Sequence, residues 1–290
     1  PMQLAPLKPP KLPAFWVAGA CARPLLRSGQ ALPVTVLDAV AEMLVFSTLD
    51  MRYAGVDRLR ELCTPASLGE FAWDLFQSWL GAGAPSKEAW AFNALAHLGD
   101  DECARKLALL IRAWPGEAAH ARAVQGLDIL AAIGSDVALM HLNGIAQKVK
   151  FKGLQERARD KIDQLAEVRG LSAEELADRL VPDLGLDADG SLRLDFGPRQ
   201  FTVGFDEALR PYVRDAAGIP LKELPKPNKS DDAPLAEAAS ERWKALKKDV
   251  RTLASQQILH FELAMAQRRR WSAAEFRQFF VEHPLLRHLC

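Results

Sequence analysis

The stretch that decides the fold is "LAHLGDDECARKL" at residues 95–107, because a similar stretch, "LAAIGSDVALMHL", follows at residues 130–142. In both copies an apolar segment ends at a glycine, Gly99 or Gly134, and a second segment with helically spaced apolar residues follows it. The two copies lie about 35 residues apart. The repeating unit is therefore predicted to be a helix, a tight turn that contains glycine, and a second helix.

Two further copies, the earlier of them weaker, extend the repeat to about four units. One begins at Leu165 and reaches its glycine at Gly170, and an earlier one is "LRELCTPASLGEFAWDLFQSWL", residues 59–80. A helical hairpin of this kind cannot bury its apolar face alone, so it stacks on its neighbours in an α-solenoid. The pattern resembles HEAT repeats, and this resemblance implies HEAT-like helical hairpins over residues 32–181.

Helix-capping residues support the predicted turns. A side-chain oxygen before a helix accepts a hydrogen bond from a free backbone N–H, and Pro fits the first helical position. The predicted caps are Thr64 followed by Pro65, then Ser86, Ser135, and the capping box of Ser172 with Glu175. Helices of about 12 to 15 residues are therefore expected beside the turns.

The N-terminal segment differs from the repeats. "PMQLAPLKPPKLP", residues 1–13, contains too many prolines for a helix and favours an extended polyproline II conformation. We assign residues 1–31 to a Pro-rich N-terminal arm. A leader or linker is the favoured reading, and a ligand for a partner is the alternative.

After residue 181 the apolar pattern changes from helical to alternating. The stretch "GLDADGSLRLDFGPRQFTVGF", residues 185–205, alternates apolar and polar residues on both sides of a Gly-Pro turn. The alternation continues downstream, so residues 182–224 are predicted to form a small antiparallel β meander of three or four strands.

The last part of the chain is again helical. Residues 225–234 form a linker, and residues 235–290 contain a long helix from about Leu235 to Gln267 that covers the sheet. A short helix follows, opened by a capping box from Ser272 to Glu275. The predicted fold class is mainly α: an α-solenoid of helical hairpins, a small β meander and a long C-terminal helix.

Three C-terminal stretches carry a resemblance to a known family: "LDFGPRQFTVGFDEALRPYVRD" (194–215), "LKELPKPNKSDD" (221–232) and "RRRWSAAEFRQFFVEHPLLRHL" (268–289). They resemble the bacterial domain-of-unknown-function 4132 family, which includes MolR-like (molybdate metabolism regulator) proteins. The resemblance implies an internal part of a much larger protein, and it supplies no catalytic residue. Some members carry a WGR domain linked with nucleic acid, but no Trp-Gly-Arg tripeptide occurs here.

Composition bounds the classes of function. The chain has 290 residues, of which 49% are hydrophobic and 26% charged, as in a globular protein with a core. Lys plus Arg and Asp plus Glu both count 37, so no global charge attracts nucleic acid or a membrane. Apolar runs are too short to span a bilayer, and the predicted location is the cytoplasm. Cys21, Cys63, Cys103 and Cys290 lack metal-ligand spacing and are expected to be free thiols.

No catalytic constellation emerges from the sequence. His283 and His288, with Glu282 alongside, lack the spacing of a helical zinc motif, so packing or capping roles are expected. The other histidines are scattered singly, and acidic pairs at helix starts complement the helix dipole. Asp187 and Asp189 begin a calcium-loop-like stretch without its final Glu, which indicates a turn. We therefore expect no enzyme, cofactor, metal or small-molecule ligand.

One basic feature has functional interest. Lys244, Lys247, Lys248 and Arg251 share one face of the predicted long helix by their spacing, and Arg268, Arg269, Arg270 and Trp271 follow at its far end. These eight residues are the candidate nucleic-acid-binding residues. Their basic side chains are expected to contact phosphates, and the Trp271 indole is expected to stack on a base. The competing interpretation is a solvated helix face. A second basic run, Lys148 to Lys161, is interrupted by carboxylates.

The expected function is a non-enzymatic interaction scaffold or regulatory module that binds a protein partner through the helical repeat surface. The chain starts at Pro1 and ends at Cys290 beyond an apolar helical pattern, so a piece of a longer protein is expected. The alternative is a nucleic-acid-binding regulatory module that uses the basic residues. Neither expectation involves a membrane.

Overall fold

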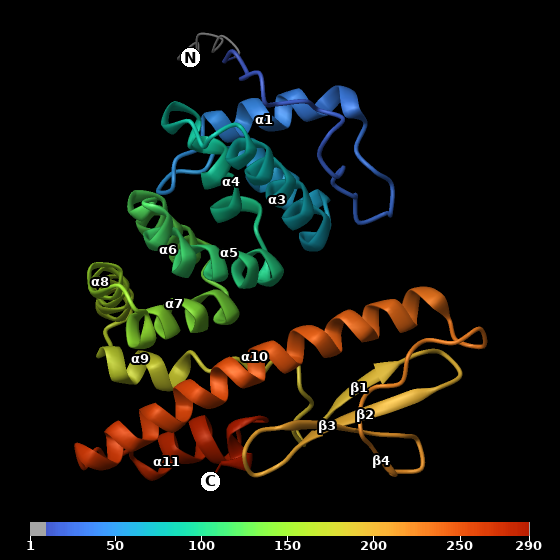
Figure 1. Ribbon diagram of the computed structural model, residues 1–290, viewed down its shortest axis with the longest axis vertical. Helices are drawn as coiled ribbons and strands as arrows, with labels where there is room; N and C mark the ends of the chain where they lie inside the picture. Colours follow the sequence, from blue (N-terminus) through green and yellow to red (C-terminus); the bar gives the residue numbers. More distant parts are fainter. Residues whose placement is uncertain (1–9, 290) are drawn as a thin grey trace, which may run out of the picture. The chain divides into compact units, whose positions relative to one another are not determined.

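The computed structural model describes residues 10–289, apart from the side chain of Lys148. It divides into two compact units, unit 1 (Pro1–Leu165) and unit 2 (Ala166–Cys290). The chain is mainly helical with one small sheet (Figure 1). No helix in the described range is both long and apolar enough to cross a membrane.

Helices that follow one another in pairs make up most of unit 1 (Figure 1). After η1 (Val34–Val36), the elements are α1 (Leu37–Val45), α2 (Ala54–Leu62), α3 (Pro65–Gly81), η2 (Ser86–Glu88), α4 (Trp90–Leu98), α5 (Asp101–Ala113), η3 (Trp114–Glu117), α6 (His120–Ile133), α7 (Asp136–Lys148) and α8 (Lys152–Val168), whose last turn extends into unit 2. In chain order, the predicted pairs correspond to α2–α3, α4–α5 and α6–α7, and α8 is followed along the chain by α9 (Ala173–Arg179). The succession of helices and short turns is confirmed, whereas their packing as HEAT-like hairpins and their stacking as a solenoid stay predictions.

The core of unit 1 contains a cluster of aromatic rings. Phe76 and Trp79 of α3 contact Phe92 of α4 with ring centroids 5.0 and 5.4 Å apart. Trp114 packs edge-on against Phe92 at 5.7 Å. All four rings are buried, so the cluster joins α3, α4 and η3 through apolar burial and aromatic contacts.

The N-terminal segment packs on these helices where it is described. The Trp16 indole N–H donates to Asp38 Oδ1 at 2.7 Å, and the backbone N–H of Leu25 donates to Ser67 Oγ at 2.8 Å. Trp16 is buried. Residues 14–31 of the predicted arm therefore pack within unit 1, while most of the predicted polyproline stretch lies outside the described residues.

The predicted caps have mixed outcomes. Ser135 Oγ accepts from the Ala138 N–H, and Ser172 with Glu175 forms the predicted capping box. Thr64 precedes Pro65 at the helix start, but its side chain makes no capping hydrogen bond. The prediction for Ser86 is wrong, because this residue lies inside the 3₁₀ turn η2 and Ala89 precedes α4.

Unit 2 contains the predicted meander as a four-stranded antiparallel sheet. The strands are β1 (Leu192–Asp195), β2 (Gln200–Phe205), β3 (Pro211–Arg214) and β4 (Pro220–Leu221), in the order β1-β2-β3-β4. Leu192 pairs with Val203, and the alternating Phe201, Val203 and Phe205 are buried. The alternation therefore predicted both the strands and their buried face.

A long helix, α10 (Ala233–Ala266), packs against β1, as Figure 1 illustrates. Asp232 caps its first turn by accepting from the Leu235 N–H. Trp243, Leu246, Val250 and Leu253 form its buried face with helical spacing. The remaining elements are α11 (Ala273–Phe276), which opens with the predicted capping box, the π-helical turn η4 (Arg277–Val281) and the 3₁₀ turn η5 (Leu286–His288).

Candidate functional site

The first four predicted basic residues lie together on the exposed side of α10. Lys244, Lys248 and Arg251 are exposed, and Lys247 is half-buried. Their backbone positions follow from the 3.6-residue period of the helix, and the buried face formed by Trp243 and its neighbours turns them outward. The predicted stripe of cations is therefore present, while its role in binding stays a prediction.

These residues line a groove of about 720 Å³ between α10 and the turn that joins β2 to β3. We call this cavity the basic groove. Its charged lining consists of Lys244, Lys247, Lys248, Arg251 and, from the turn, Arg210. No carboxylate belongs to its described lining, so the cavity favours an anion.

The cations of the basic groove differ in how they are paired. Lys244 forms an ion pair with Glu241 at 2.6 Å, and Lys247 forms one with Glu223 at 3.2 Å. All four side chains are substantially exposed, so each pair contributes only about 0–1 kcal/mol to stability. Within residues 10–289, neither Lys248 nor Arg251 forms an ion pair, and both charges face solvent.

The other four predicted residues follow the end of α10, and two of them are bound to Asp178. Arg268 and Arg270 are exposed, but Arg269 donates to Asp178, and its guanidinium lies 4.9 Å from the Trp271 ring centroid. The Trp271 indole N–H also donates to Asp178 Oδ2 at 2.9 Å. Arg269 and Trp271 are therefore engaged inside unit 2 and do not continue the exposed stripe.

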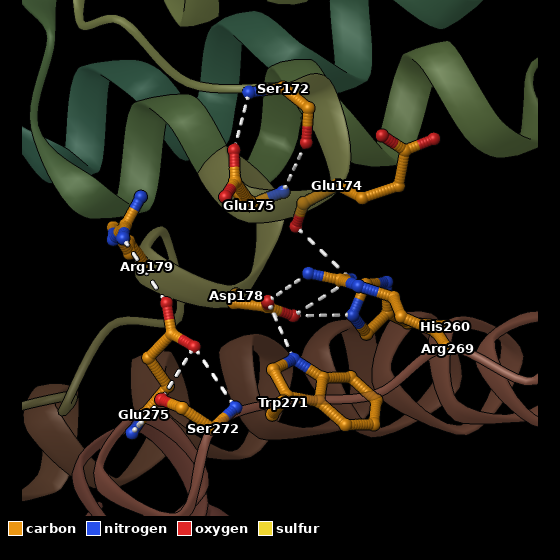
Figure 2. A network of polar contacts seen from close by, with 10 residues as sticks. All are labelled: Ser172, Glu174, Glu175, Asp178, Arg179, His260, Arg269, Trp271, Ser272 and Glu275. Atoms are coloured by element: carbon orange, nitrogen blue, oxygen red, sulfur yellow. Dashed lines mark hydrogen bonds and ion pairs between the residues drawn. The ribbon is translucent and has the colours of Figure 1, made fainter.

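Asp178 is the centre of a buried polar cluster that joins α9 to α10 and to the turn after α10 (Figure 2). His260 Nε2 lies 2.7 Å from Asp178 Oδ1, and the Arg269 guanidinium contacts both carboxylate oxygens. Asp178 is 4% exposed and His260 is 9% exposed. Figure 2 shows the three donor groups converging on the single carboxylate.

The cluster keeps Asp178 ionised. Burial acts to raise the pKa of this carboxyl, but hydrogen bonds from His260 and Trp271 and the charge of Arg269 outweigh burial and lower the pKa below its ordinary value. Because both oxygens already accept hydrogen bonds, the carboxylate has little capacity left for a substrate proton.

Two capping boxes flank this cluster on opposite sides (Figure 2). Ser172 and Glu175 open α9, and Ser272 and Glu275 open α11, while Arg179 lies 3.9 Å from Glu275. A cavity of about 250 Å³ lies beside them and is lined almost evenly by acidic and basic side chains. The described residues contain no group of three or more His, Cys, Asp or Glu side chains that could hold a metal ion.

The other sequence candidates have structural roles. His283 Nδ1 accepts from the Leu285 and Leu286 N–H groups at 3.1 and 3.2 Å, which confirms a capping role. Asp189 Oδ1 accepts from the Ser191 N–H at 2.9 Å, which confirms the predicted turn. In the second basic run, Lys161 is paired with Asp128 at 2.7 Å.

The cysteine prediction holds for the described residues. Cys21, Cys63 and Cys103 are buried free thiols, whereas Cys290 lies outside the described range. Burial raises the pKa of Cys103 to about 12, so this thiol is a poor nucleophile at neutral pH.

Sequence reasoning missed the Asp178 cluster because it treated His260 as an isolated histidine. The available signal was helical spacing, since His260 falls on the same face of α10 as Leu246, Val250 and Leu253, and a buried imidazole needs a polar partner. Asp178 lies 82 residues earlier in the chain, and no local pattern marks it as that partner.

Comparison with known proteins relates the C-terminal part of the chain to a protein family. Residues 218–290 match the family model described as "Domain of unknown function (DUF4132)", which supports the resemblance predicted from the C-terminal stretches. Over 288 residues the chain is 44% identical to "Uncharacterized protein YehI" of Escherichia coli (strain K12). The match covers 99% of this chain and 24% of that protein, so the chain spans about a quarter of its relative's length. No solved structure matches the chain.

Proposed function

We propose that this chain is a non-enzymatic interaction module of a longer protein and that it binds a protein partner. The observation that carries the proposal is the basic groove, where Lys248 and Arg251 are exposed and have no ion-pair partner among residues 10–289. The polar cluster around Asp178 favours a binding role over catalysis, because its donors and acceptors satisfy one another.

The helix pairs offer a second surface for the same kind of partner. Their period of about 35 residues lies in the range of α-solenoid repeats, and a solenoid presents an extended surface for proteins. A regulatory role, as the MolR-like resemblance implies, agrees with such an adaptor. The basic groove has the more specific support, since it combines a defined cavity with unpaired charge.

Nucleic-acid binding is the second candidate function, and the exposed cations on α10 favour it. A module that neutralises phosphates loses affinity steeply as salt rises. We would titrate the full chain into a fluorescent duplex and a single strand by anisotropy at about 50 and 150 mM salt. Salt-dependent binding that disappears in a Lys248→Glu/Arg251→Glu variant would replace the protein-binding proposal.

The protein-binding proposal is tested by placing a photo-crosslinking amino acid at position 258, inside the basic groove, in cells that express the chain within its parent protein. We expect one discrete crosslinked protein, lost in Lys248→Glu/Arg251→Glu and retained in Lys222→Glu/Lys229→Glu. The second pair of residues is exposed, lies outside the basic groove and gives the same change of charge. Equal crosslinking in both variants would contradict the proposal.

A further inference from the structure

The basic groove has two chemically different halves, and they define its ligand. Resting on the proposed binding function, we infer that the basic groove accepts a segment of a partner protein that carries acidic residues followed by an apolar side chain. The cations lie towards the N-terminal half of the α10 segment, and Ala254 and Ile258 line the C-terminal half.

The charged half selects carboxylates. Lys244, Lys247, Lys248 and Arg251 occupy successive turns of α10, and Arg210, which is paired with Asp206 at 2.8 Å, lines the cavity from the turn between β2 and β3. Lys248 and Arg251 offer unneutralised charge within the described chain, and the exposed pairs of Lys244 and Lys247 exchange readily with other carboxylates. An acidic segment is therefore complementary to this half.

To fill the apolar half of the basic groove, a ligand needs an apolar side chain as well as charge. Ala208, Leu209 and Pro211 line the cavity from the β2–β3 connection, and Ala254 and Ile258, with Ser255 between them, line it from α10. Ile258 is 47% exposed, which leaves apolar surface that an entering aliphatic or aromatic side chain would remove from water. A ligand with acidic residues alone would leave this half unfilled.

The length of the basic groove limits the ligand. From Lys244 to Ile258 the helix rises about 21 Å, which an extended peptide covers with about six residues. Half of that length is cationic and half is apolar. The matching ligand is a short segment with its acidic residues at one end and its apolar anchor at the other.

A nucleic acid fits this arrangement less well. Its phosphates are evenly spaced, whereas the cations occupy only part of the basic groove, and sequence-tolerant base stacking relies chiefly on aromatic rings. The described lining contains no aromatic side chain. Trp243 lies below Lys247, whose ammonium is 5.0 Å from the ring centroid, and the indole is buried.

The test uses fluorescein-labelled peptides of about six residues, matched to the length of the basic groove. The first carries Asp and Glu in one half and Leu and Phe in the other. In the second, amides replace the carboxylates, and in the third, Ser replaces Leu and Phe. Anisotropy with the full chain should show the first peptide binding about tenfold or more tightly than either of the others.

Protein variants assign that affinity to the basic groove. Lys248→Glu/Arg251→Glu should weaken the first peptide about tenfold, whereas Lys222→Glu/Lys229→Glu should change it less than about twofold. Ile258→Ser should weaken the first peptide but leave the Ser-substituted peptide unaffected. All substituted residues are exposed, and circular dichroism verifies that each variant folds.

Several results would overturn the inference: equal binding of the first and third peptides, equal effects of the two charge-reversal variants, or displacement of the first peptide by a tighter single-stranded oligonucleotide. If no peptide binds while crosslinking at position 258 still depends on Lys248 and Arg251, the inferred ligand is wrong and the protein-binding function stands. If that crosslinking is also absent, both fail.

Discussion

At the scale of single residues, unit 2 depends on one buried carboxylate. Asp178 receives hydrogen bonds from His260, Arg269 and Trp271, which come from α10 and the turn after it. Breaking a buried ion pair from one side is costly, because the charge left behind loses its partner. The cluster therefore holds α9 to α10 and fixes the path of the chain into α11.

Asp178→Asn keeps the shape of the side chain and removes its charge. We expect the free energy of unfolding to fall by about 3–5 kcal/mol, because Arg269 stays largely buried without a counter-charge. Urea denaturation measures the change. Glu241→Gln, in an exposed ion pair, is the control and should cost less than about 0.5 kcal/mol. A loss below about 1 kcal/mol for Asp178→Asn would show that the cluster does not hold the helices.

His141 makes unit 1 sensitive to acid. Burial, reinforced by the charges of Arg112 and Arg105, lowers the pKa of His141 from 6.5 to about 4, and neither ring nitrogen has a hydrogen-bond partner among residues 10–289. The unfolded chain thus binds a proton near pH 6.5 that the folded chain excludes until about pH 4. The free energy of unfolding should have its maximum contribution from this group above pH 6.5 and should fall by up to about 3 kcal/mol as the pH drops towards 4.

Denaturation curves at a series of pH values measure this dependence. His141→Leu should flatten the profile between pH 6.5 and 4, because the titrating group is gone. His120→Leu, at an exposed position, should leave the slope unchanged. An unchanged slope in His141→Leu would assign the acid sensitivity to another group.

At the scale of elements, the repeated glycine has two different physical reasons. Gly134 ends α6 in the left-handed region with φ 66°, where an added Cβ meets only ordinary contacts. Gly99 ends α4 with φ −66°, but a Cβ there would lie 2.4 Å from the Leu95 carbonyl oxygen. Glycine is thus needed in one copy of the repeat for its backbone conformation. In the other copy it is needed because a side chain would clash with a nearby carbonyl oxygen.

These two reasons predict different costs. Gly134→Ala should lower stability by about 1 kcal/mol, the usual penalty for a non-glycine residue in the left-handed region. Gly99→Ala should cost more, because the backbone has to move to relieve the clash. Thermal unfolding of the two variants compares them, and a larger loss for Gly134→Ala would contradict this explanation.

Much of the element pattern could be predicted from the sequence. The helix pairs, the meander and α10 follow from apolar periods of 3.6 and 2 and from side chains such as Ser172 that cap helices. Ser86 was misread because a serine that starts a 3₁₀ turn has the same local signature as a helix cap. Asp178 and the wall of the basic groove near Arg210 depend on tertiary contacts, which no local period encodes.

At the scale of the whole molecule, a zero net charge conceals an uneven distribution. Lys plus Arg equal Asp plus Glu, yet the described lining of the basic groove contains five cations and no carboxylate. Interactions with charged surfaces are therefore governed by the local cluster and not by the total.

Cation-exchange chromatography at pH 7 should reveal this distribution. We expect the chain to be retained despite its formal neutrality, and Lys248→Glu/Arg251→Glu to elute at lower salt than Lys222→Glu/Lys229→Glu. Both variants have the same net charge, so only the location of the change differs. Identical elution would show that the basic groove does not dominate the surface field.

The two sides of α10 have a consequence for redesigning specificity. Ile258 lines the basic groove, and His260, two positions further along the same helix, belongs to the Asp178 cluster. Substitutions on this stretch of α10 that alter ligand binding therefore also risk lowering the stability of unit 2. The opposite side of the cavity, Ala208 to Pro211, makes no hydrogen bond or ion pair with that cluster within residues 10–289, so a library intended to retarget the cavity should be built there.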